Sequence, residues 1–152
     1  MLGIVIFAVV LLARPRFPLS EEIQKQLTFS LLYPDGSSGH KIAADTATYD
    51  GRTKVLIFHA KKGEIDMTIS EQATPEQFND IPEYYPKLVE KLHAYTTFDS
   101  LHGKVSLTQP EELKGEQSAV FNGKGTLMFV HPSRNLSVDE WRDFFNTLAI
   151  AE

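Results

Sequence analysis

Three consecutive segments with the periodicity of β-strands constrain the fold most. Glu64–Ser70 alternates strictly between apolar and polar residues, as a strand with one buried face does. It follows His40–Tyr49 and Arg52–Ala60, which are joined by Asp50-Gly51, a pair typical of two-residue type I′ turns. Val55–Phe58 is apolar at every position, which predicts a strand covered on both faces or lying inside a sheet. The sequence therefore predicts three successive antiparallel strands.

Further strands are expected on both sides of this group. They show the same alternation or flank glycine-containing turns. These segments are Leu27–Tyr33, Ala94–Phe98, Lys104–Thr108, Gln117–Phe121 and Thr126–Val130.

Two helical segments are expected before and between the strands. Ser20–Gln26 begins with a residue that can cap a helix and continues with two glutamates, which favour its N-terminal end. A second helix is predicted from Pro75, but Pro82 and Pro86 should divide or kink it. Its apolar positions recur every three or four residues and are expected to be buried: Phe78, Ile81, Tyr85, Leu88 and Leu92.

A final amphipathic helix has the clearest start signal in the chain. Ser137 and Glu140 form the capping-box pattern. The apolar face that follows should dock on the sheet, and its residues are Val138, Trp141, Phe144, Phe145 and Leu148. The order of elements predicts an α+β fold: a curved antiparallel sheet of six to seven strands in a meander, with helices packed on it.

The N-terminal segment is different in character. Residues 2–13 (LGIVIFAVVLLA) carry no charged or polar side chain, whereas a membrane-spanning helix needs about 20 residues. We interpret residues 1–18 as the remnant of a membrane anchor with its linker, and residues 19–152 as a single domain. A signal peptide and a buried core segment are the alternatives, although the run lacks the leading basic residues and the small-residue cleavage pattern of a signal peptide.

The charge distribution suggests where the domain lies. Apart from Arg14 and Arg16, 13 basic residues face 20 acidic ones, so the remaining chain carries a net charge of −7. The two arginines alone would favour the cytoplasmic side. We nevertheless place the acidic domain outside the cell membrane, as part of a single-pass protein. Nucleic acid is not expected as a partner, because phosphate binding needs clustered basic residues.

Residues that could carry chemistry are scattered. The chain has no cysteine, and no two of its five histidines have the short spacing of a metal site. His59 and His131 lie at strand ends and could meet in space, whereas Tyr84, Tyr85 and Tyr95 could form an aromatic patch for a ligand. No nucleophile elbow, phosphate-binding loop or dinucleotide motif is present. The sequence therefore predicts no catalytic, cofactor-binding or metal-ligating residue, and no cofactor.

The order and spacing of the segments resemble a known group of proteins. The segments concerned are Leu32-Tyr33-Pro34, Lys54–Phe58, Ile65–Ser70, the helical segment from Pro75, Lys104–Thr108 with Ala119–Val130, and Asn135-Leu136-Ser137. In this order the chain resembles uncharacterised membrane-anchored bacterial extracytoplasmic domains. These are distantly similar to LolA-like lipoprotein carriers and sigma-factor-regulator domains, and the chain also resembles the PsbP/Mog1-like sandwich. The resemblance implies a binding or scaffold protein without catalytic residues, and its LolA-like side implies a sheet that cups helices and binds lipid.

Two functions follow as hypotheses. The first is a tethered, non-catalytic domain that binds a protein, a lipid or an envelope component. The alternative is a small hydrolase whose Asp, Glu or His residues are brought together by the fold. Lipid binding would require an apolar cavity on the order of 300 Å³ or more between sheet and helices, for which the C-terminal helix is the first place to look.

Overall fold

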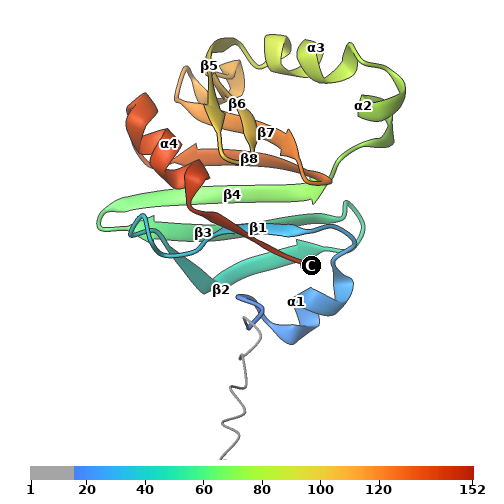
Figure 1. Cartoon of the computed structure of the whole chain (residues 1–152), viewed down its shortest axis with the longest axis vertical. Coiled ribbons are helices and arrows are strands. Elements are labelled where there is room, and N and C mark those ends of the chain that lie inside the picture. The colour runs from blue at the N-terminus through green and yellow to red at the C-terminus, as the bar shows by residue number, and fades with distance from the viewer. Residues whose placement is uncertain (1–15) are drawn as a thin grey trace, which may run out of the picture.

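The larger of two sheets holds seven strands. They are β2 (Lys41–Asp50), β3 (Val55–Lys62), β4 (Ile65–Ala73), β5 (Ala94–Ser100), β6 (Gly103–Thr108), β7 (Ser118–Gly123) and β8 (Thr126–Pro132). In this computed structural model, which describes residues 16–152, they pair antiparallel in the order β2-β3-β4-β8-β7-β6-β5 (Figure 1). The α+β prediction is confirmed. The chain builds the sheet as two meanders, β2 to β4 and β5 to β8, which join where β4 pairs with β8.

A smaller sheet pairs the first and last strands, β1 (Leu31–Pro34) and β9 (Leu148–Ala151). The strand predicted over Leu27–Tyr33 therefore starts later than expected. Leu27 instead ends the preceding helix, where its N–H donates to the Ile23 carbonyl at 3.2 Å. Leu148, predicted on the face of the last helix, begins β9, because pairing with β1 takes over from helical periodicity there.

The helices are α1 (Glu21–Gln26), α2 (Glu76–Asp80), α3 (Tyr84–Lys91) and α4 (Val138–Asn146), with a short 3₁₀ helix η1 (Glu111–Leu113). The predicted capping box of α4 is confirmed. The Ser137 hydroxyl accepts from the Glu140 N–H at 3.2 Å, and the Glu140 carboxylate accepts from the Ser137 N–H at 2.8 Å. The predicted division of the middle helix is also confirmed, since α2 and α3 are separate.

The main core lies between one face of the large sheet and a cover formed by α4, β1 and β9. Trp141, Phe144 and Phe145 of α4 are fully buried there, as are Met67 and Ile69 of β4. The predicted docking of the C-terminal helix on the sheet is therefore confirmed. Burying three large aromatic side chains contributes roughly 1.5–3 kcal/mol each to stability.

The other face of the sheet is only partly covered. Strand β3 lies inside the sheet, as one of the two interpretations of Val55–Phe58 predicted. Leu56 and Phe58 are fully buried, but Ile57 between them is 40% exposed. Coverage of both faces was therefore wrong for β3, because α2 and α3 lie beside the β5–β8 half of the sheet (Figure 1).

The type I′ turn predicted at Asp50-Gly51 is not formed there. Between β2 and β3 the connection has four residues, because the Asp50 carboxylate accepts from the N–H groups of Arg52 at 2.8 Å and Thr53 at 3.3 Å. Lys54 then takes a φ of 58°. The two-residue turn with positive φ at both positions is Lys124 (57°) and Gly125 (77°), between β7 and β8.

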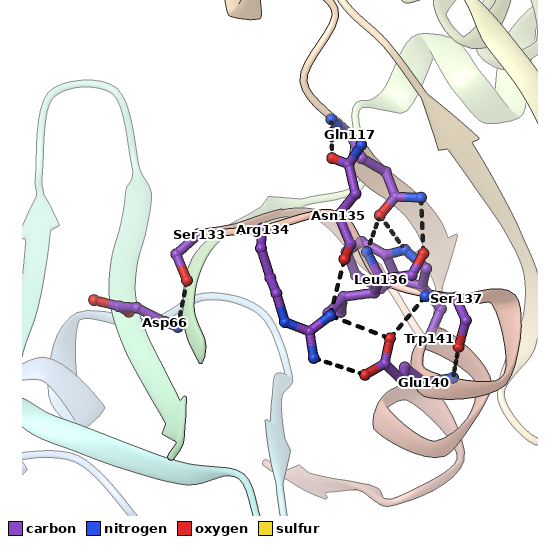
Figure 2. A network of polar contacts seen from close by, with 9 residues as sticks. All are labelled: Asp66, Gln117, Ser133, Arg134, Asn135, Leu136, Ser137, Glu140 and Trp141. Carbon is purple, nitrogen blue, oxygen red and sulfur yellow. Dashed lines mark hydrogen bonds and ion pairs between the residues drawn. The ribbon is translucent and has the colours of Figure 1, made fainter. Parts of the chain in front are cut away.

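A buried glutamine fixes the start of α4 to the sheet (Figure 2). The Gln117 Oε1 accepts from the backbone N–H of Leu136 and from the indole N–H of Trp141, both at 2.8 Å. Its amide nitrogen donates to the Leu136 carbonyl at 3.2 Å and to the Tyr95 hydroxyl at 2.6 Å. Both the oxygen and the nitrogen of this buried amide therefore have hydrogen-bond partners. These bonds fix Trp141 and the start of α4 relative to the sheet.

The predicted anchor, residues 2–13, lies outside the described residues. Within residues 16–152, none of the helices has the length and apolar character needed to cross a membrane. The chain joins the core soon after its described start, because Leu19 and Ile23 are buried in it.

Candidate ligand-binding groove

The helices α2 and α3 do not bury the apolar stripe that the sequence predicted. No residue of either helix is fully buried, and Ile81 between them is 41% exposed. The cause is their length and path. Pro82 separates them, and together they carry the chain from β4 across the sheet to its far edge at β5 (Figure 1).

An open groove of about 410 Å³ remains between these helices and the sheet. Its floor is formed by Gln72 of β4 and by Leu127 and Phe129 of β8. Its wall is formed by Pro75, Phe78 and Leu88. Gln72 and Leu127 are direct partners in the pairing of β4 with β8, so the floor is one continuous patch of the sheet.

The rim of the groove carries its polar groups. Tyr84, Lys87 and Lys91 line it from α3, and all three side chains are exposed. Leu127 in the floor is only 2% exposed, whereas Phe129 is half-buried. The groove therefore combines an apolar interior with two ammonium groups at its mouth.

Sequence reasoning missed this groove, although one signal pointed to it. Leu127-Met128-Phe129-Val130 is apolar at every position, which indicates a strand with apolar side chains on both faces. Met128 and Val130 belong to the main core, so Leu127 and Phe129 face the other side, under α2 and α3. Beside the C-terminal helix, the first place to look for a lipid cavity, the pocket at Leu136 and Glu140 has only about 30 Å³.

The predicted tyrosine patch does not form. Tyr84 lies on the rim of the groove, whereas Tyr95 does not line the groove and its hydroxyl accepts from the Gln117 amide nitrogen at 2.6 Å. Tyr85 is half-buried, and burial raises the pKa of its hydroxyl to about 12, an effect that the neighbouring Ser106 hydroxyl only partly offsets. Of the three residues, only Tyr84 is placed to contact a ligand in the groove.

His59 and His131 lie on one face of the sheet but remain apart. Both are in register with Thr68, which lies between them on β4. Each has its own carboxylate: His59 Nδ1 is 2.8 Å from Asp66, and His131 Nε2 is 3.2 Å from Glu116. Across residues 16–152, no three His, Asp or Glu side chains come close enough together to hold a metal ion.

The remaining histidines have separate local contacts. His40 is buried, its ring packs edge-on against Phe144 with centroids 5.1 Å apart, and burial, aided by Lys62, lowers its pKa. His102 Nε2 lies 2.9 Å from the Leu148 carbonyl, and His93 Nε2 lies 3.6 Å from Glu111. Each of these three histidines therefore has a contact that explains its position by a structural role.

Comparison of the chain with protein-family models, with curated proteins and with solved structures finds no match. The resemblance to membrane-anchored extracytoplasmic domains therefore stays a prediction.

Proposed function

We propose that this protein is a non-catalytic binding domain, tethered outside the cell membrane by residues 2–13, whose groove receives the hydrocarbon chain of a lipid. The observation that supports this proposal is the apolar groove of about 410 Å³ under α2 and α3. Its volume falls within the range of about 300–1,000 Å³ that is usual for small-molecule sites.

The floor of the groove favours a hydrocarbon chain over an extended peptide. Strands β4 and β8 each have a neighbour on both sides, so most of their backbone N–H and C=O groups are already paired. A peptide laid on this floor would lose water from its own backbone without finding partners, at a cost of roughly 1–3 kcal/mol for each unpaired group. A hydrocarbon chain has no such groups, and each buried methylene contributes about 0.8 kcal/mol.

The volume of the groove indicates one chain. A water-sized group occupies about 30 Å³, and a methylene group is of similar size. A groove of about 410 Å³ therefore has room for roughly a dozen such groups. This matches a single acyl chain of medium length.

The alternative, a small hydrolase, is not favoured by any arrangement in the described chain. Such an enzyme needs a nucleophile or water-activating group with a base and an orienting partner in one place. The His59–Asp66 and His131–Glu116 pairs are separate. The two histidines lie on β3 and β8, with Thr68 of β4 in register between them. We therefore base the proposal on the groove.

Calorimetric titration of the full chain with dodecanoate, below its micelle concentration, tests the proposal. We expect saturable binding at one site with a negative heat-capacity change, as burial of apolar surface requires. Leu88→Gln, which puts an amide into the wall, should weaken binding about tenfold, the equivalent of about 1.4 kcal/mol.

The neighbouring residue provides a matched control. Val89 lies on the same helix and is also half-buried, but it does not line the groove. Val89→Gln should therefore bind dodecanoate within about twofold of the original protein. Absence of saturable binding, or equal losses in the two variants, would contradict the proposal.

A further inference from the structure

Two lysines give the mouth of the groove a charge opposite to that of the domain. Among the described residues that line it, Lys87 and Lys91 are the charged ones. They are four residues apart on α3, so their side chains lie on one face of the helix. The chain as a whole carries a net charge of −5. A positive rim on an acidic protein favours an anionic ligand.

The lysines are not neutralised by acidic neighbours within residues 16–152. Neither forms an ion pair there, whereas Lys25 pairs with Glu21 and Lys104 with Asp99. Glu83 and Glu90 are close to the two lysines in the sequence, but they do not line the groove. The ammonium groups of Lys87 and Lys91 are thus available to a ligand at the point where its chain would leave the apolar interior.

We propose that the ligand of the groove is a single-chain fatty acid whose carboxylate pairs with Lys87 and Lys91 while its chain lies over Leu127. This inference rests on the proposed function and adds the chemistry of the end group. A carboxylate has two oxygens, so it can accept from one ammonium group with each. Apart from these two lysines, the described residues of the lining carry no charge, and their other polar side chains are Gln72 in the floor and Tyr84 on the rim.

The stems of the lysines fit the same arrangement. A lysine side chain can lay its methylenes along apolar surface while its ammonium group stays in water. In the groove, such stems would extend the apolar wall formed by Leu88 and would place both charges at the water boundary. The ion pair then forms where a fatty acid has its only polar group.

The experiment compares two ligands with identical chains. The full protein is titrated with dodecanoate and with 1-dodecanol, at low salt and again at high salt. We expect dodecanoate to bind about fivefold more tightly at low salt, and the preference to shrink at high salt because exposed charges are screened. In the Lys87→Gln/Lys91→Gln variant, dodecanoate should bind as weakly as dodecanol, and dodecanol affinity should stay the same.

A second pair of lysines provides the control for net charge. Lys41 and Lys61 are exposed partners on β2 and β3, and they do not line the groove. Lys41→Gln/Lys61→Gln removes the same charge and should keep the preference for dodecanoate. Loss of the preference in this variant as well would overturn the inference.

The outcomes separate the inference from the proposed function. If the original protein binds dodecanoate and dodecanol equally, the groove takes hydrocarbon chains and the carboxylate site is wrong. If dodecyl phosphate binds markedly more tightly than dodecanoate, the assignment to a fatty acid is overturned in favour of a phosphate headgroup. If none of the three binds, both the inference and the proposed function fail.

Discussion

At the scale of single residues, Glu71 is the least expected side chain of the core. It is fully buried on β4, and its Oε2 accepts from the backbone N–H of Leu32 on β1 at 3.1 Å. Its Oε1 has no hydrogen-bond partner among the described residues. Burial raises the pKa of Glu71 well above its ordinary value of 4.5, and the hydrogen bond from Leu32 only partly opposes this. Because the cost of burying the charge outweighs this hydrogen bond, the folded state favours the protonated carboxyl group.

Stability should therefore depend on pH through Glu71. The folded protein binds this proton more tightly than the unfolded chain, so the stabilisation is fully present below pH 4.5 and is lost as the pH rises through the folded pKa. In urea unfolding between pH 5 and 8, the free energy of unfolding should fall with rising pH relative to that of Glu71→Gln, with a slope of up to about 1.4 kcal/mol per pH unit as long as the pH is below the folded pKa.

Glu64→Gln is the control, since it removes an exposed carboxylate just before the same strand. Parallel pH curves for the original protein and Glu71→Gln would show that Glu71 is not the titrating group. Because the test concerns the slope, it remains valid if the buried amide lowers stability at every pH.

The sequence contained part of the information about Glu71 and Gln117. The alternation of β4 places positions 65, 67 and 69 inward, and the same period makes position 71 inward. No local pattern indicates that a carboxyl group would be buried there, because its partner, Leu32, comes from a strand far away in the sequence. Gln117 was likewise expected only as the start of a strand. The groups that satisfy its amide become neighbours only after α4 has docked.

At the scale of elements, local signals predicted best where the competing interactions were also local. The capping box of α4 is decided within a few residues, and it formed as expected. Leu148 was assigned to a helix because its spacing from Phe144 fits one, but pairing with β1 decided its conformation. The two-residue turn predicted at Asp50-Gly51 was wrong for a local reason, because the Asp50 carboxylate stabilises a longer turn by accepting from the Arg52 N–H.

The cap of α4 can be tested by substitution. Ser137→Ala removes the acceptor for the Glu140 N–H, and we expect the free energy of unfolding to fall by about 1 kcal/mol. Ser137→Asn should lose much less, because asparagine caps helices as well as serine does. Denaturant unfolding of both variants provides the measurement, and equal losses would mean that the hydroxyl does not act as a cap.

At the scale of the whole molecule, the groove and the start of the described chain lie far apart. Figure 1 places α1 at the lower end of the longest axis and α3 at the upper end. The sequence could not predict the groove as a site, because its parts come from β4, α2, α3 and β8. Their meeting depends on the path of the chain to the far edge of the sheet, which no local pattern encodes.

The proposed tether leads to a prediction for the full chain. We expect it to sediment with lipid vesicles, whereas a variant in which residues 2–13 are replaced by an equally long Gly/Ser segment should stay in the supernatant. The Gly/Ser variant should still bind dodecanoate, because the groove is built from residues 72–129. A full chain that stays in solution without vesicles and does not sediment with them would contradict the tether.

The pairing of β1 with β9 also decides how the chain could be cut and rejoined. Leu31 lies opposite Ala151, and Arg16 and Phe17 line the same surface pocket as Ala151 and Glu152. The described chain is thus almost a closed loop. A short linker from Glu152 back to Arg16 would complete a ring, and a new opening at the exposed Gly63 turn would keep every strand beside its present neighbours. The fold should therefore tolerate circular permutation, because its strand pairing does not depend on where the chain begins and ends.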